Sequence, residues 1–96
     1  MTHTVIVEFP CAPGKGKEFL SLLFAALVDT RAYAGCLSVE TFFDQDNPDL
    51  IILWEKWAKR TDQEKYLAWR VESGMLDMIG PFLNGVPKFV HLTAAD

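Results

Sequence analysis

Residues 36–57 constrain the fold of this chain more than any other segment, because they predict a β-hairpin. Two runs rich in β-forming residues, CLSVETFFD (36–44) and LIILWEKW (50–57), flank the turn DQDNPD (44–49). Two such runs joined by an Asn-Pro-Asp turn are typical of antiparallel strands. Apolar side chains occur on both faces of the runs, which favours a sheet that is covered on both sides.

The segment before the hairpin changes from a strand pattern to a helix pattern. Residues 3–9 (HTVIVEF) are rich in β-forming residues, and the proline and glycine of PCAPG end this strand. From Lys15 onward, apolar residues recur at helical spacing, which predicts a helix that ends at about Thr30 or Arg31. Gly35 then permits the reversal into the hairpin.

The segment after the hairpin predicts a second helical region and a last strand. The sequence TDQE (61–64) matches a capping box, in which the Thr61 hydroxyl accepts the Glu64 amide proton and the Glu64 carboxylate reaches back. A helix is expected to begin there and to be interrupted at Gly74. MLDMIGPFL continues as a second helical piece, and PKFVHL (87–92) predicts the final strand.

The resulting order β–α–β–β–α–β predicts an α+β, ferredoxin-like fold with four antiparallel strands and two helices on one face. Residues 1–96 are expected to form a single domain. The second sheet face needs a cover, and another copy of the chain is the simplest one. Isologous pairing of two such sheets would give a dimeric α/β barrel, so a homodimer is predicted.

Composition restricts the partners of the chain. Half of the residues are apolar and 12% are aromatic, which is rich for a chain of 96 residues and favours an interface, a ligand pocket or both. A net charge of −4 with scattered basic residues argues against nucleic acid and anionic membranes as partners. No apolar run reaches bilayer length and no signal peptide is recognisable, so a cytoplasmic protein is expected.

The sequence does not predict a metal centre. Cys11 and Cys36 lack zinc-site spacing, and only His3 and His91 could supply imidazole ligands. The two cysteines are expected to be reduced thiols. The acidic turn 44–49 does not have the spacing of a calcium-binding loop.

The most distinctive segment for function is 50–70, which contains all three tryptophans of the chain. Residues two apart in a strand share a face, so Glu55 and Trp57 point one way and Trp54 the other. Trp54 is interpreted as packing at a dimer interface. Trp57 is either a core residue or a pocket wall that stacks on a planar substrate. Glu55 is either a structural hydrogen-bond or ion-pair partner or a catalytic base.

Tyr66, Trp69 and Arg70 stand at i, i+3 and i+4 of the predicted second helix and therefore share one side. If that side faces the sheet, these residues and Trp57 form an aromatic slot with a phenol, a guanidinium and a carboxylate at its edges. We therefore name Glu55 and Tyr66 as candidate catalytic residues, and Trp57, Trp69 and Arg70 as candidate substrate-binding residues. The alternative for Trp69 and Arg70 is the surface of an amphipathic helix.

Three segments resemble the antibiotic-biosynthesis monooxygenase domain, a dimeric α/β-barrel family. They are APGKGKEFLSLL, AGCLSVETFFDQDNPDLIILWEKW and RTDQEKYL. The resemblance implies a dimeric barrel with a pocket between sheet and helices in each subunit. It also implies that Glu55 and Trp57 look toward the helices, while Trp54 faces the barrel interior.

Members of that family include oxygenases that need no metal or flavin, haem-degrading oxygenases, isomerases and proteins without known activity, so the fold alone leaves the chemistry open. Many members carry a histidine where this chain has Tyr66. The haem-degrading members use a histidine ligand and a first-strand asparagine, whereas the first-strand candidate here is Glu8. The resemblance therefore argues against haem degradation.

Two functions follow from these residues. The first is a cofactor-independent monooxygenase that oxidises a small quinol or polyphenol, with Glu55 or Tyr66 moving a proton and Arg70 holding the phenolate. The second is a non-catalytic dimeric barrel that binds a small apolar ligand or a protein partner. Tyr66 in place of the family's histidine motivates the second function.

Overall fold

The computed structural model describes residues 2–96 and contains the predicted order of elements. The elements are β1 (His3–Pro10), α1 (Gly16–Ala32), β2 (Cys36–Phe43), β3 (Leu50–Trp57), α2 (Arg60–Glu72), α3 (Met75–Ile79), the short 3-10 helix η1 (Gly80–Phe82) and β4 (Lys88–Leu92).

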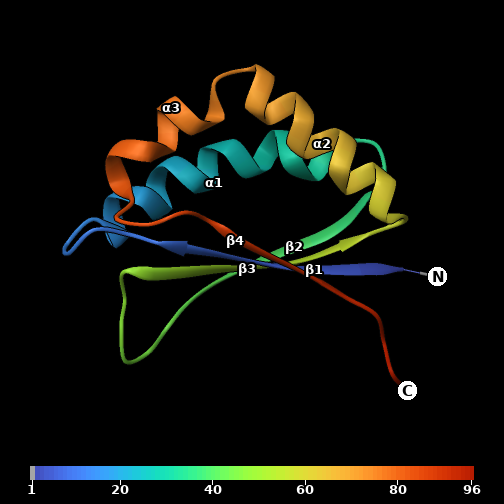
Figure 1. Cartoon of the computed structure of the whole chain (residues 1–96), viewed down its shortest axis with the longest axis horizontal. Helices are drawn as coiled ribbons and strands as arrows, with labels where there is room; N and C mark the ends of the chain where they lie inside the picture. The colour runs from blue at the N-terminus through green and yellow to red at the C-terminus, as the bar shows by residue number, and fades with distance from the viewer. Residues whose placement is uncertain (1) are drawn as a thin grey trace.

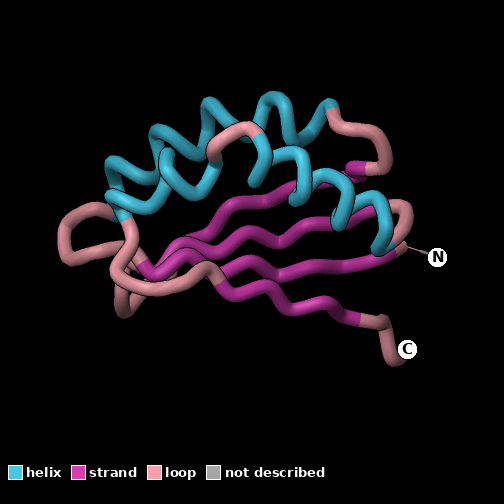
Figure 2. The backbone as a smooth tube through the Cα atoms, turned by 45° about the horizontal axis from the view of Figure 1, so that its top comes forward, coloured by secondary structure: helices cyan, strands magenta, loops and turns pink. Residues whose placement is uncertain are grey.

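The four strands form one antiparallel sheet in the order β2-β3-β1-β4, so β1 and β3 are central. All helices lie on the same face of this sheet, and the other face is bare (Figure 1). Figure 2 shows the two layers, helices above and strands below. The prediction of an α+β, ferredoxin-like fold is confirmed.

The helix-facing side of the sheet forms the floor of the core. Val5 and Val7 of β1 are buried, as are Leu53 and Trp57 of β3, and Phe19 of α1 packs onto them. Each fully buried side chain of this size contributes about 1.5–3 kcal/mol relative to an exposed one. The prediction that Glu55 and Trp57 share one face of β3 and that Trp54 lies on the other is confirmed, because the first two are buried and Trp54 is exposed.

The opposite face of the sheet exposes large apolar side chains. Trp54 is 39% exposed and Phe42 is 48% exposed, and both project from the face without helices. Exposed aromatic residues on a central sheet face are unusual in a chain that acts alone. The dimeric barrel and the interface role of Trp54 stay predictions.

The capping box predicted for α2 is wrong. The helix begins at Arg60, and extended Lys59 is in the N-cap position, two residues before Thr61, without a side-chain cap. Thr61 therefore lies within the first helical turn instead of adopting the extended backbone of an N-cap residue. Glu64 pairs with Arg60 instead, with 3.5 Å between Nε and Oε2 on the exposed surface.

The cap of α1 comes from the distant hairpin turn. The Asp49 carboxylate accepts the backbone N–H of Gly14 through Oδ2 at 3.0 Å and that of Gly16 through Oδ1 at 2.9 Å. The approach is so close that a Cβ at position 16 would lie 2.6 Å from the Pro48 carbonyl oxygen. The contact explains why glycine begins this helix and fixes the β2–β3 turn against α1.

Gly74 interrupts the second helical region, as predicted. Its φ of 92° is the left-handed conformation that glycine adopts at low cost, and it separates α2 from α3. Within residues 2–96, no helix combines the length and apolar character needed to cross a bilayer.

The first and last strands are joined by their side chains as well as by their backbones. Val5 of β1 is the register partner of His91 in β4. Nε2 of His3 lies 2.8 Å from Nδ1 of His91, a hydrogen bond whose donor depends on the tautomers. The lone histidines of the sequence are therefore partners of each other.

Asp49→Ala should lower the free energy of unfolding by about 0.5–2 kcal/mol, the usual range for losing an N-terminal helix cap. Urea unfolding followed by circular dichroism measures the change. Asp46→Ala is the matched control, because Asp46 is an exposed residue of the same turn and uses only its backbone N–H there. Equal stability of the two variants would contradict the capping role of Asp49.

Candidate functional site

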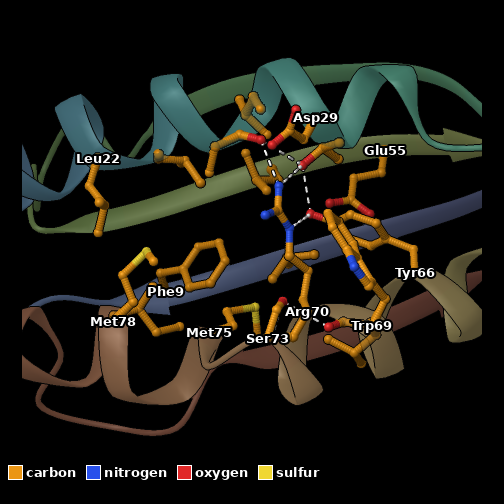
Figure 3. Close-up of a pocket in the computed structure, with 18 of the residues that line it drawn as sticks. Phe9, Leu22, Asp29, Glu55, Tyr66, Trp69, Arg70, Ser73, Met75 and Met78 are labelled. Carbon is orange, nitrogen blue, oxygen red and sulfur yellow. Dashed lines mark hydrogen bonds between the residues drawn. The ribbon is translucent and has the colours of Figure 1, made fainter.

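A cavity of about 240 Å³ lies between the helices and the sheet. Val7, Leu53 and Glu55 contribute from the sheet, and the walls come from α1, α2 and α3 (Figure 3). The lining is predominantly apolar. Apolar cavities of about 150 Å³ can hold benzene, so this one has room for a substituted ring.

Glu55 is the carboxylate of the cavity. Its side chain is 3% exposed, and its Oε1 accepts the indole N–H of Trp57 at 2.9 Å. Burial raises the pKa of Glu55, and the smaller effect of the Trp57 hydrogen bond opposes that rise. Glu55 forms no ion pair in residues 2–96, so the ion-pair interpretation given to it does not apply. A buried carboxylate without a cationic partner is suited to taking up a proton.

Trp57 does not line the cavity. It is fully buried beneath it, with its ring centroid 5.3 Å from that of Tyr66. Of the two interpretations given to this residue, the geometry matches the core residue. Its direct contact with the site is the hydrogen bond that orients Glu55.

Tyr66 and Arg70 lie on the same side of α2 and line the cavity, as their spacing predicted. The Tyr66 hydroxyl lies 2.6 Å from Thr30 Oγ1 and accepts a hydrogen bond from Arg70 Nε at 2.8 Å. Arg70 Nη2 also donates to the Ala26 carbonyl oxygen at 2.7 Å and to Thr30 Oγ1 at 3.2 Å. Figure 3 shows Arg70 reaching from α2 across to α1.

The charge of Arg70 is not neutralised within residues 2–96, because its guanidinium forms no ion pair there. The guanidinium carbon instead lies 4.7 Å from the ring centroid of Trp69 and 5.3 Å from that of Tyr66. Such cation–π contacts stabilise a cation but leave its charge able to attract an anion. The cavity thus contains one cation suited to an oxyanion of a ligand.

Trp69 stands at the rim of the cavity. It is 40% exposed and, with Asp29, also lines a second, shallower hollow of about 370 Å³ beside Tyr33. In the close-up, Trp69 of α2 lies beside Arg70, and Asp29 lies on α1, toward which the guanidinium of Arg70 points (Figure 3). The exposed position of Trp69 indicates that the cavity opens to solvent between these helices.

Gln63 is a buried polar residue of the cavity that was not predicted from the sequence. Its side chain is 2% exposed, it lines the cavity, and its Oε1 has no hydrogen-bond partner within residues 2–96. The signal was present in the spacing, because Gln63 precedes Tyr66 by three residues and Arg70 by seven. Residues at these intervals share one side of a helix.

The histidines and cysteines lie outside the cavity lining. Cys11 and Cys36 are free thiols, and burial raises the pKa of both. No group of three or more potential metal-binding side chains comes together in residues 2–96.

The family model for antibiotic biosynthesis monooxygenases matches residues 2–79. The chain therefore belongs to the antibiotic biosynthesis monooxygenase family, as its sequence motifs indicated. No functionally curated protein matches the sequence.

Solved structures show the same fold. A crystal structure described as an antibiotic biosynthesis monooxygenase has a TM-score of 0.84 at 21% identity, over 98% of this chain and 99% of that one. A conserved protein from Methanosarcina mazei Go1 has a TM-score of 0.83 at 15% identity, over 96% and 91%. A Mycobacterium tuberculosis protein has a TM-score of 0.77 at 24% identity, over 100% and 97%.

Glu55→Gln should remove a pH-dependent loss of stability. Burial raises the pKa of Glu55 in the folded chain. The contribution of protonated Glu55 to the free energy of unfolding is therefore fully present below the pKa of the unfolded state, and it declines as pH rises through the pKa of the folded state. The variant should therefore be more stable than the wild type at pH 8, and this advantage should shrink at pH 4. Its amide oxygen can still accept the Trp57 N–H.

Chemical unfolding of both proteins across this pH range measures the difference. Glu72→Gln, an exposed change on α2, is the control and should show no such trend. A stability difference between Glu55→Gln and wild type that stays constant with pH would rule out a raised pKa for Glu55.

Proposed function

We propose that the chain is a cofactor-independent monooxygenase that oxidises a small quinol- or polyphenol-type aromatic in the cavity. The observation that carries the proposal is the combination of an apolar cavity of about 240 Å³ with the buried Glu55 and the unneutralised Arg70. Family membership supports the oxygenase class. The substrate class comes from the chemistry of the lining.

The apolar lining suits the ring system of such a substrate. Phe9, Leu23, Leu53 and Ile79 come from four different elements and surround the space with hydrocarbon. Transfer of an aromatic ring from water into such surroundings is favourable by about 25 cal/mol for each Å² of apolar surface buried. The few polar groups then determine how the ring is oriented.

The chemistry places modest demands on the protein. Triplet dioxygen reacts poorly with closed-shell molecules, but a phenolate can donate an electron to it directly. Recombination of the resulting radicals forms a carbon–oxygen bond, and loss of water leaves a quinone. One oxygen atom enters the ring, the other leaves as water, and the ring supplies all four electrons. The protein therefore has to remove a phenolic proton and exclude bulk water.

Glu55 is the proton acceptor in this scheme, and Trp57 holds its carboxylate in place. Arg70 stabilises the phenolate charge, acting from a position that Tyr66 and Trp69 fix by hydrogen bonding and stacking. Tyr66 supports Arg70 in this arrangement and does not itself need to accept a proton.

One observation favours the alternative, a non-catalytic barrel that binds a small apolar ligand. The Tyr66 hydroxyl is already bonded to Thr30 and Arg70. It is therefore not available as a base at the position where many family members carry a histidine. Under this alternative the cavity binds the same class of aromatic ligand, and no product is formed.

Purified, metal-free protein should take up oxygen faster than the non-enzymatic rate with at least one member of a panel of hydroquinones. Glu55→Gln should lower kcat by about 100-fold or more, because general-base catalysis typically contributes that much and an amide cannot accept the proton. An oxygen electrode measures the rates.

Glu72→Gln provides the control and should retain full activity, since Glu72 is exposed at the end of α2. If the panel quenches tryptophan fluorescence without any oxygen uptake, the ligand-binding alternative replaces the enzyme. Unchanged kcat in Glu55→Gln would remove Glu55 from the mechanism.

We also propose that two copies pair through their bare sheet faces as a homodimer. Trp54→Glu would place a carboxylate in the centre of that face, where burial of an unpaired charge opposes association. The variant should elute from size-exclusion chromatography with light scattering at half the mass of the wild type. Val86→Glu, in an exposed loop, is the control. A wild-type mass of one chain would contradict the proposed pairing.

A further inference from the structure

Gln63 is a buried polar side chain whose amide oxygen lost its hydrogen bonds to water on folding and gained none from residues 2–96. It is 2% exposed, and its Oε1 has no hydrogen-bond partner among residues 2–96. A buried acceptor of this kind costs about 1–3 kcal/mol, and most buried polar groups in proteins are paired. Gln63 also lines the cavity, so a turn of its terminal amide can bring the unpaired oxygen to the cavity, where a bound ligand can pair with it.

Gln63 and Arg70 place polar groups in two separate parts of the cavity. They are seven residues apart on one side of α2, which corresponds to about 10 Å along the helix axis at about 1.5 Å per residue. Between them in sequence, Leu67 contributes an apolar side chain to the lining. A ligand that meets both groups must therefore carry two separate oxygen atoms, such as hydroxyls at para positions of one ring.

The amide of Gln63 selects the kind of group it can meet. The terminal torsion of a glutamine is broad, so the amide can present either its oxygen or its nitrogen. A hydroxyl can both donate and accept, and it therefore matches either orientation. A hydrocarbon edge matches neither and would leave the amide unpaired.

We propose that Gln63 is a specificity-determining residue that hydrogen-bonds a second ligand hydroxyl, so that the cavity prefers dihydroxylated aromatics to their monohydroxylated analogues. This inference rests on the ligand class given under the proposed function, but it does not require turnover. The first hydroxyl meets Arg70, and the second meets Gln63.

The test compares the affinities of 1,4-dihydroxynaphthalene and 1-naphthol, measured by tryptophan fluorescence under anaerobic conditions that prevent oxidation. The wild type should bind the dihydroxylated ligand about 10-fold more tightly, the effect of one good hydrogen bond of about 1.4 kcal/mol. In Gln63→Leu this preference should fall to about 2-fold or less. Affinity for 1-naphthol should be unchanged or higher.

Thermal unfolding provides a second readout. Without ligand, Gln63→Leu should melt at the same temperature as wild type or higher, because it removes an unpaired buried polar group. Gln63→Met is the second apolar variant and should behave in the same way. Gln45→Leu, in the exposed hairpin turn, is the control and should keep the wild-type ligand preference.

Three results would overturn the inference. The first is an unchanged ligand preference in both apolar variants, as expected if the amide meets only a water molecule. The second is a clear loss of stability or folding in both, which would show that Gln63 has a structural partner. The third is no binding of either ligand by the wild type at millimolar concentration.

Oxygen uptake in air separates this inference from the proposed oxidation. A Gln63-dependent preference without oxygen uptake leaves Gln63 in its role and removes the monooxygenase activity. Oxygen uptake with a ligand preference that does not depend on Gln63 supports the monooxygenase activity and removes Gln63 from its proposed role.

Discussion

The hydrogen bonds of Arg70 connect α2 to α1, and the shape of the cavity depends on that connection. The only buried residue of α2 is the polar Gln63, and the partly buried Tyr66 packs against the core. Arg70 donates to Ala26 and Thr30 of α1, while Tyr66 meets the same threonine. A polar attachment holds the two helices across a space that close apolar packing would fill.

The sequence predicted the fold well because its signals are local. Strand and helix periods, the hairpin turn and the glycine at position 74 each specify their own segment, and the family motifs lie in three segments between residues 12 and 67. The start of α2 was mispredicted because TDQE satisfies a pattern that the backbone does not use. The Asp49 cap of α1 was missed because its partners are more than 30 residues away in sequence.

The site was predicted only in part, because local spacing shows which side of an element a residue occupies but not how deep it lies. Helical spacing placed Tyr66 and Arg70 on one side, and strand alternation placed Glu55 toward the helices. Spacing could not show that Trp57 lies beneath the cavity, since depth depends on the packing of several elements at once. Gln63 was not predicted because its significance depends on the missing hydrogen-bond partner of its buried Oε1 within residues 2–96, which a sequence does not show.

The two imidazoles that join β1 to β4 have a consequence for acid conditions. A hydrogen bond between His3 and His91 needs one nitrogen without a proton. Burial, together with the nearby charges of Arg60 and His3, lowers the pKa of His91, although Glu64 opposes this shift. A proton added to the acceptor nitrogen turns it into a donor, and the hydrogen bond is then lost. The edge strand β4, on the side of the sheet opposite β2, therefore loses one attachment to β1 when this nitrogen is protonated.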